Sequence, residues 1–263
     1  MKKISLRTIQ SYKDKQEKFS CLALYDAPMA RMAERCEIPL ILVGDSLGMT
    51  VLGFDSTVPV TMDHMLYHIE AVRRGNDLSL IVGDLPFMSY ATTDLAVKNA
   101  TAVMQAGAHL VKLEGGSWLC DSVRRLTDSG IPVCAHLGLT PQSVNKFGGF
   151  RVQGRDEQDA KKILEDAVAL EEHGAALLVI ECVPAALAKQ ISERLSIPVI
   201  GIGAGGDCDG QILVINDIIG LTESPPKFAK NFLAEVKDIP AALTLYASQV
   251  REGNFPTIEH TFS

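Results

Sequence analysis

Three acidic residues stand where short apolar runs end. Asp45 follows the run PLILVG, Asp84 follows LIVG, and Glu114 closes the run HLVKL. Apolar runs of this length are typical of strands buried on both faces of a parallel sheet, and the carboxyl ends of such strands meet at one edge. Carboxylate oxygens, without the His and Cys spacing of a zinc site, are ligands that hard cations prefer. We therefore predict a Mg²⁺ site formed by Asp45, Asp84 and Glu114. Any one of these acids alone is equally compatible with a helix N-cap or a loop salt bridge.

Lys112 and His136 add a cation and a proton carrier to the same edge. Lys112 lies two positions before Glu114, so the two side chains share one face of their strand. A lysine beside a metal suits a substrate carboxylate or a developing oxyanion; the alternative is a charge partner for Glu114 alone. His136 ends the next apolar run and is placed to donate a hydrogen bond or move a proton. A structural histidine with both nitrogens bonded is the alternative for His136.

Glu181 ends a later run, Ala176–Ile180, on the far side of the predicted ring of strands. We predict that it faces the metal across a pocket rather than binding it. Its apolar neighbours remove water, which makes a carboxylate a stronger base, so Glu181 is the candidate general base. The alternative is a helix-capping acid ahead of Pro184. The glycines of Gly201–Gly206 resemble a dinucleotide fingerprint, but another strand follows within ten residues, where that fingerprint needs a long helix.

The elements that must position these residues alternate between strand and helix. A polar lead-in helix is expected over Ser5–Lys18. The predicted strands are Phe19–Tyr25, runs that open at Pro39, Leu80, His109 and Ile131, then Ala176–Ile180, Val199–Ile202 and Ile212–Ile215. The predicted helices are Ala27–Arg35, one capped by Thr61, one starting at Thr93 or Asp94, Trp118–Ser129, Asp156–His173, Ala185–Leu195, and one or two within Lys227–Arg251.

The connections carry further expectations. Residues 46–60 and 138–155 are predicted to be long loops at the catalytic edge. Only Ala204–Gln211 separates the last two strands, so the seventh helix should be a single turn or absent. The last dozen residues are expected to form a surface tail.

This alternation predicts an α/β fold, a (β/α)8 barrel formed by a single catalytic domain over residues 1–263 with an N-terminal lead-in helix. An open doubly wound sheet is the alternative.

Composition restricts the class of partner. The chain has 263 residues, 47% of them hydrophobic, and a net charge of −7. An acidic protein without a basic patch is not suited to nucleic acid or an anionic membrane surface. No apolar stretch of membrane-spanning length or secretory leader is evident, so we expect a cytoplasmic enzyme. The six cysteines include no CxxC pair and are expected to be free, buried side chains in a reducing compartment. Cys182, beside Glu181, is the one cysteine weighed as a nucleophile.

Several strings resemble the ketopantoate hydroxymethyltransferase family over about residues 22–262. They are VGDSLGM at Val43–Met49, DSTVPVT at Asp55–Thr61, DLPFMSY at Asp84–Tyr90, KLEGG at Lys112–Gly116, HLGLTPQS at His136–Ser143, VQGR at Val152–Arg155, ECVP at Glu181–Pro184 and GIGAG at Gly201–Gly205. The sequence departs from the family pattern at Leu24, Gly206 and Asn216, which puts contacts with the donor substrate in question.

The resemblance implies a barrel of the phosphoenolpyruvate-mutase-like superfamily, assembled as a homodecamer with one Mg²⁺ per subunit. It implies hydroxymethyl transfer from 5,10-methylenetetrahydrofolate to 3-methyl-2-oxobutanoate, giving 2-dehydropantoate in pantothenate biosynthesis through a Mg-stabilised enolate. On the family pattern Asp45, Asp84 and Glu114 serve the metal, and Glu181 accepts the proton. The substrate contacts are Asp45, Ser46, Asp84 and Lys112.

Two other functions are weighed against this one. A carbon–carbon lyase of the same superfamily would carry a cysteine on a mobile Lys-Lys-Cys-Gly-His loop, and the loops 46–60 and 138–155 contain no cysteine. A non-catalytic oxo-acid sensor on the same barrel would be expected to lack Glu181 or Lys112, and both are present.

Overall fold

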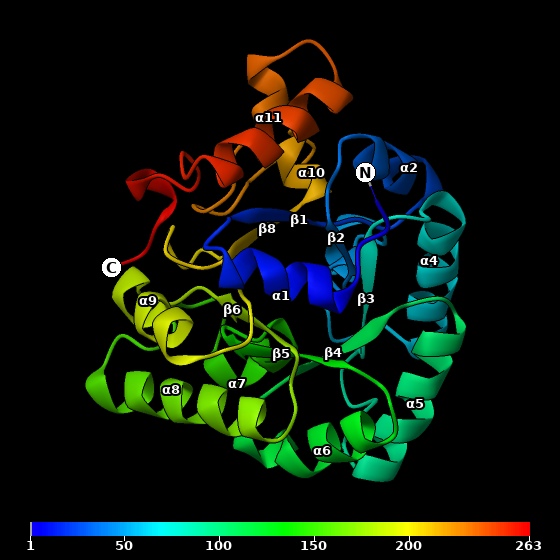
Figure 1. Cartoon of the computed structure of the whole chain (residues 1–263), viewed down its shortest axis with the longest axis vertical. Helices are drawn as coiled ribbons and strands as arrows, with labels where there is room; N and C mark the ends of the chain where they lie inside the picture. Colours follow the sequence, from blue (N-terminus) through cyan, green and yellow to red (C-terminus); the bar gives the residue numbers. More distant parts are fainter. Residues whose placement is uncertain (1) are drawn as a thin grey trace.

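Eight parallel strands close into a barrel in which each strand pairs with the next and β8 returns to β1 (Figure 1). The computed structural model describes residues 2–263. The strands are β1 (Phe19–Ala23), β2 (Leu40–Val43), β3 (Leu80–Asp84), β4 (Leu110–Glu114), β5 (Val133–Gly138), β6 (Leu177–Glu181), β7 (Val199–Ile202) and β8 (Gly210–Val214). The (β/α)8 prediction is confirmed, and the open doubly wound sheet is wrong.

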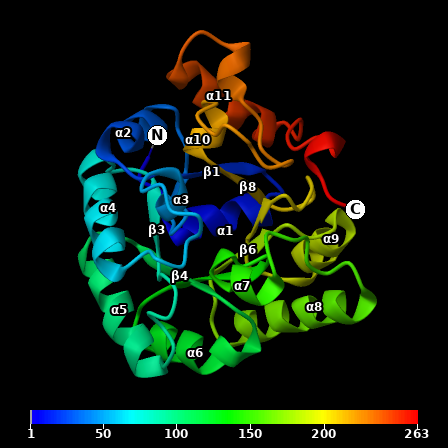
Figure 2. The ribbon, with the colours of Figure 1, turned by 180° about the vertical axis from the view of Figure 1, so that it is seen from behind.

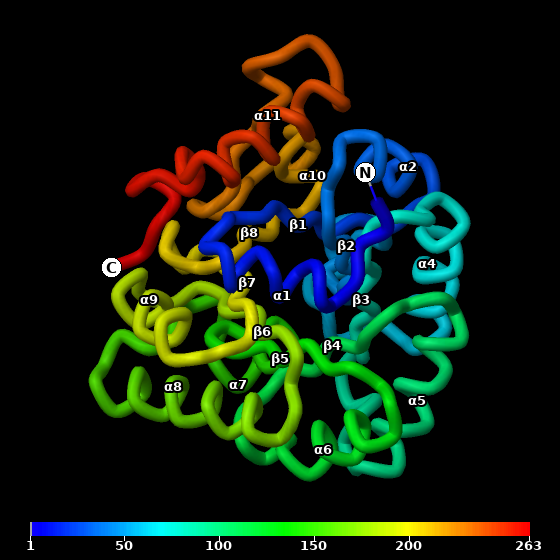
Figure 3. The backbone as a smooth tube through the Cα atoms, in the orientation of Figure 1, coloured from blue at the N-terminus to red at the C-terminus, as the bar shows by residue number. Residues whose placement is uncertain are grey.

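Helices surround the barrel and cover the outer faces of its strands (Figure 3). The main helices are α2 (Ala27–Arg35), α4 (Met62–Gly75), α5 (Thr93–Gln105), α6 (Cys120–Asp128), α8 (Glu157–Glu172), α9 (Ala185–Arg194) and α11 (Ile239–Arg251). Helix α4 begins as predicted, because Thr61 accepts a hydrogen bond from the backbone of His64 within a capping box. Its buried face is formed by Met65, Ile69 and Val72.

The lead-in helix α1 (Leu6–Asp14) lies across the amino-terminal end of the barrel. Gln10 donates to the carbonyl of Ser196, just before β7, and Lys13 pairs at 2.8 Å with Asp209, just before β8. Figure 1 views this end, with α1 in front, and Figure 2 views the opposite end, where the short helices α3 (Leu47–Thr50) and α7 (Val144–Phe147) lie. The carboxyl ends of the strands are therefore the open end of the barrel.

The loops at the open end differ from the sequence-based expectation. Residues 46–60 include α3, and residues 138–155 include the 3-10 helix η2 (Pro141–Ser143) and α7, so neither segment is a plain loop. One-turn helices have no apolar repeat that a pattern search can find. The short connection between β7 and β8 has no helix, as predicted, and α10 (Ile215–Ile218) follows β8.

The carboxyl-terminal residues lie mostly at the surface, as predicted, but contacts at two points hold them against the barrel, so they do not form a free tail. Phe255 is buried against Phe232 of η3 (Phe232–Glu235) and Tyr246 of α11, with ring centroids 5.3 and 5.9 Å away. After η4 (Ile258–His260) the backbone N–H of Ala185 donates to the carbonyl of Phe262 at 3.1 Å. Burial of aromatic rings and this backbone pairing attach the chain end to the open rim beside α9, where Figures 1 and 2 both place it.

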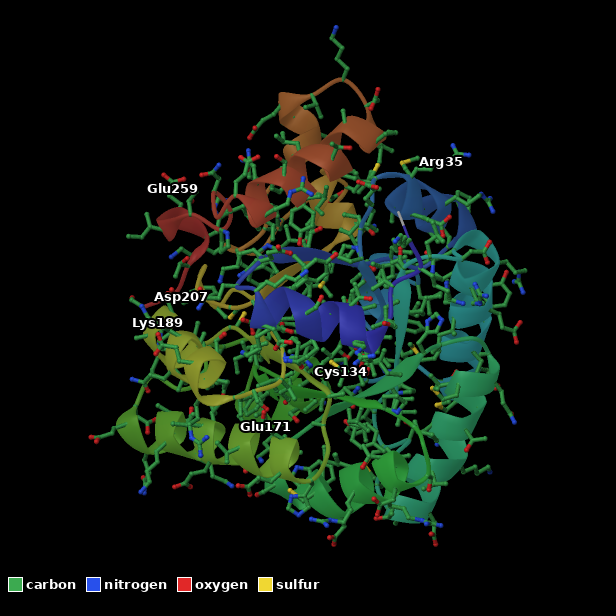
Figure 4. The ribbon with its side chains drawn as sticks, in the orientation of Figure 1. Arg35, Cys134, Glu171, Lys189, Asp207 and Glu259 are labelled. Carbon is green, nitrogen blue, oxygen red and sulfur yellow. The ribbon has the colours of Figure 1, made fainter. Side chains whose placement is uncertain are left out.

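The cysteines are free, as predicted, and all except the half-buried Cys36 are buried. Figure 4 shows Cys134 near the middle of the barrel, whereas Lys189 of α9 and Asp207 lie together at its edge, 3.8 Å apart. Burial raises the pKa of the Cys182 thiol, which leaves it protonated and unsuited to act as a nucleophile. Among residues 2–263, no helix combines the length and the apolar character needed to cross a bilayer.

Candidate active site

Asp45, Asp84 and Glu114 meet inside the open end of the barrel. Asp45 follows β2, Asp84 ends β3 and Glu114 ends β4, and all three are buried. Each offers one carboxylate oxygen, and these oxygens lie within 4.8 Å of one another. The three predicted ligands therefore form a single cluster.

Lys112 reaches into this cluster from the middle of β4. Its ammonium lies 2.6 Å from Oδ2 of Asp84 and 2.8 Å from Oε1 of Glu114, with both ion pairs buried. Parallel pairing places Asp84 beside Lys112 in the barrel wall, which accounts for the first contact. Lys112 and Glu114 share a face as predicted, and Lys112 pairs with two acids rather than with Glu114 alone.

The charges of the cluster balance with a divalent cation when all three acids are ionised. Three ionised carboxylates and one ammonium would carry a formal charge of −2 in a buried site. Burial and the neighbouring Asp84 charge raise the pKa of Asp45 well above its usual range, and burial also raises the pKa of Asp84. Glu114 behaves differently: burial opposes ionisation, but the Lys112 charge and a hydrogen bond from His136 lower its pKa to about 2.

This donor set fits a hard divalent cation. The ligand atoms are all carboxylate oxygens, which suit Mg²⁺, and the uncompensated charge equals that of a divalent ion. Oδ1 of Asp84 is buried and makes no hydrogen bond to any residue of the described chain. A buried oxygen without a partner is costly, and a bound cation would remove that cost.

His136 lies between two of the acids. Its Nδ1 is 3.2 Å from Oε1 of Glu114, and its Nε2 is 3.2 Å from Oε2 of Glu181, an ion-pair distance without hydrogen-bond alignment. Burial and Lys112 oppose protonation of the ring, but the two carboxylates outweigh them and raise the pKa of His136. His136 is therefore linked to both the cluster and Glu181.

Glu181 ends β6, and its side chain is 15% exposed, so it is the most accessible acid of the site. Its Oε2 lies 3.2 Å from Nε2 of His136, and it lines the same cavity as the three acids of the cluster. Its backbone is fixed by Gly138: a Cβ at that position would lie 2.2 Å from the carbonyl oxygen of Glu181, so only glycine fits there.

Gln142 of η2 is a site residue to which the sequence reasoning gave no role. Its side-chain amide donates to Oδ2 of Asp45 at 2.8 Å and to the carbonyl of Leu85 at 2.9 Å. Its backbone N–H donates to Oε2 of Glu114 at 3.0 Å, and its own side-chain oxygen accepts from Tyr90 at 2.6 Å. The available signal was the HLGLTPQS string, but a polar residue in a predicted loop gives no sign that it is buried.

Ser46 is half-buried beside the cluster, and its hydroxyl lies 2.8 Å from the hydroxyl of Tyr25. Ser46 directly follows Asp45, so this contact with Tyr25 lies close to the carboxyl end of β2. The predicted substrate residues Asp45, Ser46, Asp84 and Lys112 all line the same cavity.

That cavity has a volume of about 530 Å³ and includes every site residue predicted from the sequence. Its inner end is formed by the acids, Lys112 and His136. Its outer part is formed by less buried residues of the rim, among them Phe150, Phe228 and Phe262. This inner end is buried and charged, and its carboxylate oxygens suit a cation. With a cation bound, it can bind a small anionic ligand, and Glu181 can remove a proton from that ligand.

Comparisons with known proteins agree with this geometry. The family model described as ketopantoate hydroxymethyltransferase matches residues 3–258. A protein from Saccharophagus degradans is 65% identical over 261 residues, covering 99% of this chain and 97% of the relative. One from Shewanella loihica is 55% identical over 264 residues, covering 100% of both. Both are named 3-methyl-2-oxobutanoate hydroxymethyltransferase.

Solved structures resemble the fold at low sequence identity. Phosphonopyruvate hydrolase matches with a TM-score of 0.63 and 14% identity, covering 100% of this chain and 92% of that one. A 2,3-dimethylmalate lyase, described as a member of the PEP mutase/isocitrate lyase superfamily, matches with a TM-score of 0.56 and 14% identity, covering 79% and 80%. These similarities support the predicted barrel class.

Proposed function

The chain belongs to the ketopantoate hydroxymethyltransferase family, and from this we propose that it makes 2-dehydropantoate for pantothenate biosynthesis. The one-carbon donor is 5,10-methylenetetrahydrofolate and the acceptor is 3-methyl-2-oxobutanoate. Both curated relatives described above carry the name of that activity and match essentially end to end. The observation that carries the proposal is the buried Asp45–Asp84–Glu114 cluster with Glu181 lining the same cavity.

Asp45, Asp84 and Glu114 would hold one Mg²⁺ per subunit. When bound, the ion supplies Lewis acidity at the keto oxygen of the oxo acid, which makes the C3 proton easier to remove. The charge of −2 left by the three acids and Lys112 makes this part of the cavity suitable for a cation and unsuitable for an unaccompanied anion.

Proton transfer and charge stabilisation are assigned to three residues of the chain. Glu181 accepts the C3 proton, and the electrons of the broken C–H bond form the C2–C3 double bond of the enolate. The Lys112 ammonium provides positive charge close to the oxygen that gains charge. His136 lies 3.2 Å from both Glu181 and Glu114, and it is placed to donate a hydrogen bond or move a proton between them.

Carbon–carbon bond formation then balances the reaction. C3 of the enolate bonds to the methylene carbon of the donor, and both bonds from that carbon to the folate nitrogens break. Water supplies the hydroxyl group, the C3 proton and the second proton of water go to the two folate nitrogens, and tetrahydrofolate leaves. Ser46, beside Asp45, is assigned to the oxo-acid carboxylate together with Lys112.

The proposal includes the assembly and location implied by the family: a single catalytic domain over residues 1–263 in a cytoplasmic homodecamer. Its partners are small molecules, with no nucleic acid and no membrane.

The test is proton NMR of 3-methyl-2-oxobutanoate in deuterated water with the protein and Mg²⁺, with and without the folate donor. We expect loss of the C3 proton signal without donor, and 2-dehydropantoate only when donor is added. Absence of both changes would contradict the proposal. Proton exchange without product at any donor concentration would keep enolisation but contradict the transfer.

A further inference from the structure

The side chain of Tyr90 is buried behind the acid cluster, in the connection between β3 and α5. Within residues 2–263, neither Tyr90 nor Gln142 is among the residues that line the cavity, so neither is placed to contact a bound substrate. The Tyr90 hydroxyl nevertheless lies within hydrogen-bond distance of Gln142 and of the main chain of Glu114. Tyr90 therefore contacts the supports of the cluster and not the space that the cluster encloses.

The Tyr90 hydroxyl has one proton to donate, and the distances indicate its acceptor. The side-chain oxygen of Gln142 is the nearer acceptor, at 2.6 Å, and the carbonyl oxygen of Glu114 is 3.1 Å away. The hydroxyl oxygen in turn accepts a hydrogen bond from the backbone N–H of Glu114 at 3.3 Å. The end of β4 thus holds the hydroxyl in place, and the hydroxyl holds the side chain of Gln142.

The proton of Tyr90 determines which way round the Gln142 amide is held. With its oxygen bonded to Tyr90, the amide directs its nitrogen to Oδ2 of Asp45 at 2.8 Å and to the carbonyl of Leu85 at 2.9 Å. Both of these partners are acceptors, so a rotated amide would present its oxygen to them and lose both hydrogen bonds. Within the described chain, Tyr90 is the one donor to the amide oxygen.

Trp118 keeps the ring of Tyr90 in position. The two rings are stacked, with centroids 6.2 Å apart and planes inclined by 15°. Gly115 makes room for the indole, because a Cβ at that position would lie 2.6 Å from it, and the φ of +143° is one that other residues rarely adopt. The indole is 64% exposed, so its position follows from this stacking rather than from burial in the core.

The loop that carries Trp118 is fixed from the outer layer of helices. Asp166 of α8 is buried and accepts a hydrogen bond from the backbone N–H of Ser117 at 2.9 Å. Its Oδ2 would lie 2.2 Å from a Cβ at Gly116, so the loop fits closely against the carboxylate. Figures 1 and 2 show α8 beside α6, the helix that follows this loop. Contacts therefore run from α8 through the loop to the ring of Tyr90.

We propose that Tyr90 is a positioning residue for the metal site. Its hydroxyl holds the Gln142 amide so that the amide nitrogen fixes the carboxylate of Asp45. This inference rests on the proposed function, which places Mg²⁺ at the acid cluster, and it adds a residue outside the cavity. A carboxylate that is already oriented binds a cation more tightly, because less freedom is lost on binding. Tyr90 acts through Gln142, so its effect depends on that residue.

Tyr90→Phe removes one oxygen atom and keeps the ring that stacks on Trp118. We expect this change to weaken Mg²⁺ binding about tenfold, the lower end of the range for residues that orient metal ligands. The measurement is calorimetry with Mg²⁺ alone, so it does not depend on turnover. Tyr67→Phe is the matched control, because Tyr67 of α4 is 69% exposed and the loss of its hydroxyl should leave Mg²⁺ affinity unchanged.

A double-mutant cycle separates positioning from a general loss of stability. In a Gln142→Leu protein the amide that Tyr90 orients is absent, so adding Tyr90→Phe should weaken Mg²⁺ binding by less than about threefold. Multiplication of the two single effects in the double variant would contradict the proposal. Wild-type Mg²⁺ affinity in Tyr90→Phe alone would contradict it as well.

Trp118→Ala tests the same role in a protein that keeps the Tyr90 hydroxyl. Removal of the stacking ring should weaken Mg²⁺ binding about two- to fivefold, because the hydroxyl is then less firmly placed. Phe87→Ala, which removes another exposed ring, at 43% exposure, should bind Mg²⁺ like the wild type. Equal affinities of Trp118→Ala and Phe87→Ala would contradict the part assigned to the stacked rings.

The readouts separate this inference from the proposed function. A wild-type protein that binds no Mg²⁺ contradicts the metal site and the function that depends on it. A wild-type protein that binds Mg²⁺ and exchanges the C3 proton of the oxo acid supports the function. If Tyr90→Phe then has the same Mg²⁺ affinity as that wild type, only the positioning role is contradicted.

Discussion

The side-chain amide of Gln142 donates a hydrogen bond to Oδ2 of Asp45 at 2.8 Å. Because Tyr90 donates to the oxygen of the same amide, its nitrogen must face Asp45. The backbone N–H of Gln142 also holds Oε2 of Glu114. A single residue of η2, Gln142, therefore sets the orientation of two carboxylates that come from β2 and β4.

Gln142→Leu should weaken Mg²⁺ binding about ten- to hundredfold, because residues that orient metal ligands have effects of that size. The measurement is calorimetry with metal alone, so the result does not depend on turnover. Trp118, the single tryptophan, stacks on Tyr90 at 6.2 Å and provides a fluorescence signal for the same titration. Gln158→Leu, at an exposed position of α8, is the control. Wild-type Mg²⁺ affinity in Gln142→Leu would remove this positioning role.

Asp45→Asn should stabilise the metal-free protein at neutral pH. Burial and Asp84 raise the pKa of Asp45, so the folded state holds this proton more tightly than the unfolded state. The contribution of Asp45 to stability is therefore largest below its unfolded pKa of about 4 and is lost as pH rises toward the folded value. An amide cannot ionise, and it still offers an oxygen to Gln142.

The measurement is thermal unfolding at pH 7 with and without Mg²⁺. Removing about 1 kcal/mol of this electrostatic cost would raise the Tm of metal-free Asp45→Asn by about 2–4 °C. Mg²⁺ should raise the Tm of the wild type and leave that of the variant unchanged. Asp55→Asn, at an exposed position outside the cluster, should behave like the wild type. A metal-free variant that melts below the wild type would show that Asp45 carries no electrostatic cost.

Glu181→Gln should bind the oxo acid and Mg²⁺ but lose C3 proton exchange by at least about a hundredfold, since an amide cannot accept the proton. The NMR exchange assay measures the rate, and calorimetry checks that binding persists. Glu193→Gln, on the exposed face of α9, should exchange at the wild-type rate. Undiminished exchange in Glu181→Gln would assign the proton to another base.

The sequence was sufficient to predict which residues meet at the strand ends, and insufficient to predict which residues form the rim of the cavity. Asp45, Asp84, Glu114 and Lys112 could be placed together because a buried parallel strand has a fixed period and a recognisable end. Gln142 and Phe262 could not be placed, since each acquires its position from contacts with residues far along the chain, at Asp45 and Ala185. Local sequence pattern contains no information about such contacts. For this reason the sequence did not predict that Phe262, near the end of the chain, lines the cavity.

Asp84→Ala should abolish both Mg²⁺ binding and Mg²⁺-dependent binding of the oxo acid. The change removes the only cluster oxygen that is buried without a partner and leaves the buried Lys112 ammonium paired with Glu114 alone. The remaining charge near the metal position is too small to compensate for dehydrating a divalent ion.

In the wild type, chelation with EDTA should stop C3 exchange, and added Mg²⁺ should restore it. Asp121→Ala, at an exposed position of α6, should show the same reversible loss as the wild type. Circular dichroism of Asp84→Ala distinguishes an inactive folded barrel from an unfolded chain, and Asp84→Asn repeats the test in case the alanine variant does not fold. Exchange that persists in EDTA, or in a folded Asp84 variant, would mean that the carboxylate cluster holds Lys112 in place and does not serve a metal.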